Sequence, residues 1–166
     1  MIRTARPEEF EAVGEVTVRA FLDGGHLSAA SEYRQTLLDV AARAAEAEVL
    51  VSVEGDKVLG TVTVADGGTA YADIAAPGEL EFRMLAVAPE AAGKGVGTAL
   101  VRAVIARART LGRERVVLSS QQSMTIAHGL YRRFGFERTP KRDWEPVPHL
   151  RLVTFGLELI DRARPA

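Results

Sequence analysis

The stretch Glu81-Phe-Arg-Met-Leu-Ala-Val-Ala-Pro-Glu-Ala-Ala-Gly-Lys-Gly-Val-Gly-Thr-Ala-Leu100 decides how this chain folds. Its first part, Glu81–Val87, predicts a strand, and Thr98–Leu111 predicts an amphipathic helix. The alternate glycines between them let the backbone adopt positive φ and approach a ligand closely. Because the first-turn amides of a helix lack intrahelical partners, they would point outwards and bind an anion such as a pyrophosphate. From the loop alone, a tight turn without a ligand stays an alternative.

The segments on either side of this stretch alternate between strand and helix patterns. Strands are predicted at Ile2–Ala5, Glu48–Val53, Val58–Val64, Arg115–Ser119, Phe136–Arg138 and Leu150–Leu159. Helices are predicted from Pro7 to Phe21, over Ser31–Ala45 and over Met124–Arg133. With no repeat and no linker between them, these elements predict one α/β (α+β) domain with a mixed sheet over residues 1–166.

The composition excludes several classes of protein. Of the 166 residues, 47% are hydrophobic and 26% are charged, which is typical of a folded domain. A net charge of −1 argues against binding to nucleic acid or to an anionic membrane, and no apolar run approaches the roughly 20 residues of a membrane span. The absence of cysteine excludes disulfides and thiolate chemistry, and it is compatible with a cytoplasmic location.

The histidines and serines indicate no metal site and no hydrolase. His26, His128 and His149 lack the spacing of metal ligands, so no metal is expected. We expect His128 to be structural. The serines at 119, 120 and 123 lie in no nucleophile-elbow motif and have no evident histidine partner, which argues against a serine hydrolase.

Two motifs resemble those of the GNAT acetyltransferases. Ala92-Gly-Lys-Gly-Val-Gly97 is similar to their acetyl-CoA motif, Gln/Arg-x-x-Gly-x-Gly/Ala, although Ala92 stands where the family has arginine or glutamine. Met124-Thr-Ile-Ala-His-Gly-Leu-Tyr-Arg-Arg-Phe-Gly-Phe136 resembles the later motif Asn-x-x-Ala-x-x-Leu-Tyr-x-x-x-Gly-Phe, with Met124 in place of asparagine. The opening strand and helix are also similar, so the likeness spans nearly the whole chain.

The resemblance implies an N-acetyltransferase that moves an acetyl group from acetyl-CoA to a primary amine, on a mainly antiparallel sheet flanked by helices. The implied acetyl-CoA site consists of Leu85, Ala86, Val87, Gly93, Lys94, Gly95, Val96, Gly97 and Thr98. Leu85–Val87 would hold the acetyl-pantetheine arm and supply an amide to the carbonyl oxygen. Lys94, Arg132 and Arg133 are candidates to neutralise the coenzyme A phosphates.

Tyr131 and Glu81 are the candidate catalytic residues. By its place in the second motif, Tyr131 would protonate the leaving thiolate, and the alternative is a ring that fills the core. The resemblance implies that Glu81 would deprotonate the amine, because many family members carry a glutamate on this strand. Strand alternation would put it on one face with Arg83, Leu85 and Val87. Its alternatives are a solvated charge or an ion pair with Arg83, and Glu79 replaces it as the base if the register differs.

The acceptor is left open between a small-molecule amine and a protein or peptide amine. The segments expected to select it are residues 24–45, 66–78 and 143–149, the last of which contains Trp144. Acidic residues in the middle segment favour a cationic small molecule. A non-catalytic acyl-CoA-binding sensor on the same fold is the alternative function, and a homodimer stays open.

Overall fold

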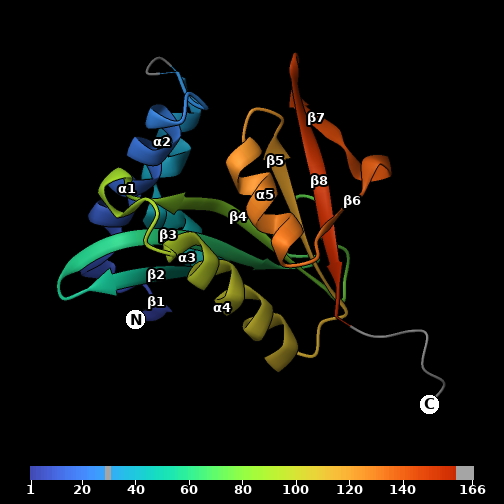
Figure 1. Ribbon diagram of the computed structural model, residues 1–166, viewed down its shortest axis with the longest axis horizontal. Helices are drawn as coiled ribbons and strands as arrows, with labels where there is room; N and C mark the ends of the chain where they lie inside the picture. Colours follow the sequence, from blue (N-terminus) through green and yellow to red (C-terminus); the bar gives the residue numbers. More distant parts are fainter. Residues whose placement is uncertain (29–30, 160–166) are drawn as a thin grey trace.

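The computed structural model describes residues 1–28 and 31–159, and Figure 1 shows one domain in which helices cover a twisted sheet. The strands of the described chain are β1 (Ile2–Thr4), β2 (Glu48–Glu54), β3 (Lys57–Asp66), β4 (Glu79–Val87), β5 (Arg115–Gln121), β6 (Glu137–Arg138), β7 (Trp144–Val147) and β8 (Leu150–Glu158). Their order in the sheet is β1-β2-β3-β4-β5-β8-β6, with β7 pairing β8. Only β4 and β5 run parallel, which confirms the predicted mixed, mainly antiparallel sheet.

The helices follow the predicted pattern except in one region. They are α1 (Phe10–Asp23), α2 (Tyr33–Leu38), α3 (Val40–Glu46), α4 (Val96–Thr110) and α5 (Thr125–Arg133), with short 3₁₀ turns at Pro7–Glu9, Pro89–Ala91 and Pro140–Arg142. The single helix expected over Ser31–Ala45 is wrong, because the chain leaves the helical conformation at Asp39. The Asp39 carboxylate instead accepts a hydrogen bond from the Ala42 amide at 3.2 Å and so caps α3.

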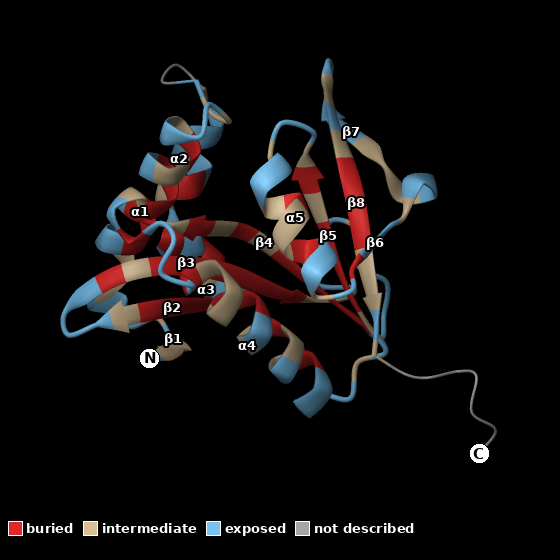
Figure 2. Cartoon of the chain, viewed as in Figure 1, coloured by how far each residue is buried: buried red, intermediate tan, exposed pale blue. Residues whose placement is uncertain are grey.

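The centre of the sheet is covered on both faces. Every residue of β3 from Gly60 to Ala65 is buried, as Figure 2 shows for the middle strands. Helices α1 and α4 both pack on β3 and β4. At Gly60 the approach of α4 is close: a Cβ atom there would lie 2.7 Å from Val96 Cγ1 and 3.1 Å from Leu100 Cδ1. The start of α4 therefore packs closely against β3, the strand that pairs with β4.

Strand β7 is the element that the sequence pattern did not predict. Pro146 and Pro148 disfavour a strand in the interior of a sheet, but Trp144 pairs with Leu152 and Val147 pairs with Leu150. Because β7 pairs only with β8, the one proline within it, Pro146, interrupts no second ladder. The resulting hairpin extends from the end of the sheet beside β5 (Figure 1).

In the part of the chain that the structure describes, none of the helices has both the length and the apolar character needed to cross a membrane.

Candidate active site

Strands β4 and β5 pair only at their beginnings. The parallel ladder joins Glu79 to Arg115, Leu80 to Val116 and Glu81 to Val117, and then it ends. Beyond Glu81 the two strands diverge, which can be followed in Figure 1. The edge of β4 that faces β5 therefore has no strand partner along its second half, so its peptide groups are available to a ligand.

A bulge in β4 lies at the same place. Thr63 on β3 pairs with Arg83, whereas Thr61 pairs with Ala86, so β4 carries one residue more than β3 between these pairs. Met84 adopts φ 55°, a left-handed conformation that costs a non-glycine residue about 1–3 kcal/mol. The common face predicted for Glu81, Leu85 and Val87 is therefore wrong: beyond Arg83 it is Ala86 that continues the face of Glu81.

The glycine loop begins directly after β4 and the following turn. Gly93 and Gly95 both have φ 78°, and Gly95 is the N-cap of α4. The first hydrogen bond of the helix runs from the Ala99 amide to the Gly95 carbonyl at 3.0 Å. The amides of Val96, Gly97 and Thr98 precede this bond and have no intrahelical acceptor. Together with the positive end of the helix dipole, they form a site suited to a phosphate group.

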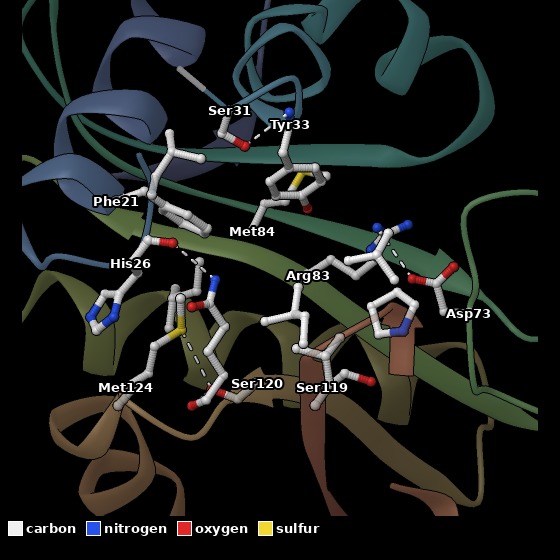
Figure 3. Close-up of a pocket in the computed structure, with 18 of the residues that line it drawn as sticks. Phe21, His26, Ser31, Tyr33, Asp73, Arg83, Met84, Ser119, Ser120 and Met124 are labelled. Carbon is white, nitrogen blue, oxygen red and sulfur yellow. Dashed lines mark hydrogen bonds and ion pairs between the residues drawn. The ribbon is translucent and has the colours of Figure 1, made fainter. Parts of the chain in front are cut away.

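Between the diverging strands lies a cavity of about 560 Å³ (Figure 3). The β4 residues from Glu81 to Leu85 line it, as do Tyr131 on α5 and Trp144 on β7. Residues from each segment expected to select the acceptor also line the cavity, namely Tyr33, Asp73 and Trp144. Tyr33 is 37% exposed, because its ring lies at the cavity and not in the core.

Tyr131 has both of the features that the sequence left as alternatives. Its ring is 4% exposed and packs in the core against Phe82, Phe136 and Phe155, with ring centres 5.6 to 6.0 Å apart. The residue nevertheless lines the cavity, and no described residue forms a hydrogen bond with its hydroxyl group. Burial raises the pKa of Tyr131, so the phenol is a neutral hydrogen-bond donor.

Glu81 is fully buried at the beginning of the divergent segment. Its Oε1 accepts hydrogen bonds from the amides of Ile74 and Ala75 at 2.8 and 2.9 Å, whereas Oε2 has no partner among the described residues. Burial raises the pKa of Glu81 more than these amides lower it. A carboxylate with a raised pKa and a free oxygen beside a cavity is suited to accept a proton.

The structure supports neither an ion pair between Glu81 and Arg83 nor a role for Glu79 as the base. Arg83 is not the partner of Glu81, because its guanidinium lies 3.2 Å from Asp73 Oδ2 and donates to the Tyr71 carbonyl at 3.0 Å. Glu79, the fallback base, does not line the cavity. Both of its oxygens bind Arg142, one at 2.8 and the other at 2.9 Å, and Oε2 also binds Arg115. Burial acts to raise the pKa of Glu79, but these arginines outweigh it and the pKa is lowered.

The structure adds a buried pair that sequence reasoning missed. His128 Nε2 lies 3.0 Å from Ser120 Oγ, so Ser120 does have a histidine partner, although α5 and β5 had to be placed before this was visible. Burial and then the nearby Arg132 lower the pKa of His128, so its imidazole is neutral. Among the described residues no carboxylate completes a triad with them, and no group of three possible metal ligands occurs.

The basic candidates for phosphate binding lie on the surface. Lys94 is exposed in the glycine loop, and Arg132 and Arg133 are exposed at the end of α5. The Arg132 guanidinium also lies 6.0 Å from the centre of the Phe155 ring. Of these three cations, Lys94 is adjacent in sequence to the amides of α4.

Comparison with known proteins gives one consistent result. Residues 11–136 match the model of the acetyltransferase (GNAT) family. An uncharacterized N-acetyltransferase of Schizosaccharomyces pombe is 34% identical over 83 residues, which is 50% of each protein. Mycothiol acetyltransferase of Cellulomonas flavigena is 34% identical over 113 residues, which is 64% of this chain and 32% of that protein. The chain therefore spans half or less of the length of these curated relatives.

Solved structures share the fold over nearly the full chain. A GNAT-family protein of Desulfovibrio desulfuricans superposes with a TM-score of 0.77 at 17% identity, covering 96% of this chain and 99% of that one. An acetyltransferase of Salmonella typhimurium, solved with acetyl-CoA, gives 0.69 at 24% identity, with 100% and 97% covered. A GNAT acetyltransferase of Brucella melitensis, also in complex with acetyl-CoA, gives 0.62 at 28% identity, with 96% and 90% covered.

Proposed function

This chain belongs to the GNAT family of acetyltransferases, and we propose that it transfers the acetyl group of acetyl-CoA directly to a primary amine. One observation carries the proposal: β4 separates from β5 after Glu81, and the glycine loop follows the end of the same strand. An extended thioester-bearing arm fits between diverging strands, and a pyrophosphate fits the amides at the start of α4. One continuous segment, from β4 to the start of α4, thus fits both the thioester-bearing arm and the pyrophosphate of acetyl-CoA.

The proposed binding residues for acetyl-CoA divide into two groups. Leu85, Ala86 and Val87 hold the acetyl-pantetheine arm along the unpaired edge of β4, and a peptide N–H there polarises the thioester carbonyl. The backbone from Gly93 to Thr98, which includes Lys94, Gly95, Val96 and Gly97, binds the pyrophosphate. Support for the second group comes from the outward amides of α4 and from the exposed position of Lys94.

In the proposed reaction, the amine nitrogen attacks the thioester carbonyl carbon, and the carbon–sulfur bond then breaks. The proton lost by the amine passes to Glu81, directly or through one water molecule, at the carboxylate oxygen that has no protein partner. The departing thiolate takes the hydroxyl proton of Tyr131. Burial raises the Tyr131 pKa, so the phenol is protonated before the reaction, and the phenolate recovers a proton from solvent after the thiol leaves.

Replacement of Tyr131 by phenylalanine tests the mechanism. The change keeps the ring contacts with Phe82, Phe136 and Phe155 and removes only the hydroxyl group. We expect kcat to fall about 100-fold, the lower range for loss of a general acid, while the Kd for acetyl-CoA stays the same. Thiol release and calorimetry measure these two quantities.

The outcomes separate the alternatives. An unchanged kcat, under conditions where chemistry limits the rate, would leave Tyr131 with its packing role alone. Wild-type protein that binds acetyl-CoA but releases no thiol with any class of amine would favour the acyl-CoA-binding sensor. A cytoplasmic location, and an acceptor drawn from small molecules or from proteins, stay predictions.

A further inference from the structure

The cavity extends beyond the unpaired edge of β4 into a part lined mainly by other elements, here called the acceptor half. Its walls are Phe21 on α1, Tyr33 on α2, Met84 on β4 and Trp144 and Val147 on β7. Figure 3 shows Phe21, Tyr33 and Met84 directed into the same space. Apolar side chains therefore form most of the surface that an acceptor would contact.

The charges on these walls are predominantly negative. Three carboxylates line the cavity, those of Glu32, Asp73 and Glu81, against a single arginine and no lysine among the described lining residues. That arginine, Arg83, is already held by Asp73 and by the Tyr71 carbonyl. The cavity thus offers no free guanidinium or ammonium group to pair with an acidic substrate, and burying an unpaired anion there would be costly.

One carboxylate oxygen at the cavity lacks a hydrogen-bond partner. Glu81 Oε2 is buried without a partner, and Glu81 lines the cavity beside Met84 and Leu85. A buried acceptor without a donor is unfavourable, so an ammonium or amine N–H near this end would satisfy it. The amino group is therefore drawn to the end near β4, which leaves the rest of the molecule among Tyr33, Trp144 and Val147.

The polar groups on the walls are largely engaged within the protein. Ser119 Oγ accepts a hydrogen bond from Trp144 Nε1 at 3.0 Å, and the Gln121 side chain donates to the His26 carbonyl at 3.1 Å. His26 Nδ1 itself lies 2.8 Å from Ser123 Oγ. Outside the edge of β4, an extended peptide would bring several amide groups into contact with side chains that have few free partners for them.

We infer that the acceptor is a compact primary amine carried on an aromatic or branched aliphatic body, without a carboxylate or phosphate group. This inference rests on the proposed acetyl transfer. It follows from the apolar walls, the surplus of carboxylates and the unpartnered oxygen of Glu81. The volume of about 560 Å³ also limits the size of the acceptor, because the acetyl-pantetheine end occupies part of the same cavity.

A matched set of amines tests the inference by thiol release. The set contains 2-phenylethylamine, phenylalanine and phenylalanine amide, together with spermidine and a short peptide that begins with alanine. We expect kcat/KM for 2-phenylethylamine to exceed the values for phenylalanine, spermidine and the peptide by about tenfold or more. Phenylalanine amide should lie well above phenylalanine, because the two compounds share their size and differ in the negative charge.

A variant ties this selectivity to the acceptor half. Trp144→Ala should lower kcat/KM for 2-phenylethylamine, whereas calorimetry should show the same Kd for acetyl-CoA as in the wild type. Turnover of phenylalanine, spermidine or the peptide that equals or exceeds that of 2-phenylethylamine would overturn the inference and leave acetyl transfer intact. Thiol release with none of these amines would overturn the inference, and only a lack of thiol release with every class of amine, proteins included, would overturn the proposed function as well.

Discussion

The glycine loop and the acceptor half of the cavity are built in opposite ways. The loop is one continuous stretch whose chemistry lies in backbone amides and in the positive φ angles of Gly93 and Gly95. The acceptor half is assembled from side chains that are far apart in sequence, from Phe21 on α1 to Trp144 on β7. Binding of the donor should therefore depend on backbone geometry, whereas choice of the acceptor should depend on individual side chains.

The largest expected effect comes from placing a charge in the glycine loop. Aspartate is among the residues that tolerate a positive φ, so Gly95→Asp should fold. No heavy atom lies within 4 Å of the added Cβ position, so the substitution meets no clash. Its carboxylate would face the bound phosphates, and we expect a loss of acetyl-CoA affinity of roughly 10³-fold by calorimetry, from repulsion at about 4 Å.

Gly95→Asn is the matched control for this substitution. Asparagine has nearly the same shape as aspartate and also tolerates a positive φ, but it carries no charge. It should retain affinity within about tenfold of the wild type. Equal losses in the two variants would mean that shape, and not the charge of the ligand, governs this site.

The second largest effect is expected for Glu81, which lies between the glycine loop and the acceptor half of the cavity. In Glu81→Gln the amide oxygen can still accept from Ile74 and Ala75, but the side chain can no longer accept a proton. We expect kcat/KM to fall about 100-fold with an amine that is protonated at neutral pH. Acetyl-CoA binding should be unchanged.

The pH profile separates this role from a structural one. Burial raises the Glu81 pKa, so the active, deprotonated form accumulates only as the pH rises above the ordinary range for glutamate. The kcat/KM of the wild type should therefore rise with pH through this raised pKa. This rise, the acidic limb of the pH profile, should be absent in Glu81→Gln. Because amine ionisation gives a similar limb, acceptors of different pKa must be compared. A limb that tracks only the amine, with full activity of the variant, would rule out Glu81 as the base.

The smallest effect is expected on the acceptor side. Trp144→Ala removes a ring from the cavity wall, and the KM for an apolar amine should rise about tenfold with a smaller change in kcat. Trp144→Phe keeps an aromatic ring and loses only the hydrogen bond to Ser119, so its KM should lie closer to that of the wild type. A change in acetyl-CoA affinity in either variant would contradict the separation of the two regions.

Sequence patterns predicted the elements with strong local signals. The glycine loop, the amphipathic helix after it and the alternating strands are specified by nearby residues, and all occur where they were expected to within a few positions. Two predictions failed for lack of a local signal. Asp39 interrupts a helix-favouring stretch because it caps the next helix, and β7 forms despite Pro146 because β8 offers an edge.

By itself the sequence predicted the fold class and a turn suited to an anion, because these depend on short-range spacing, and the resemblance to the GNAT family supplied Tyr131 and Glu81 as candidate catalytic side chains. Only the tertiary structure decided how they meet. The bulge at Met84 shifted the face of β4, Arg142 engaged Glu79, and Asp73 engaged Arg83, which left Glu81 as the carboxylate with a free oxygen. These outcomes depend on burial and on contacts between residues distant in sequence, and no pattern within one segment encodes them.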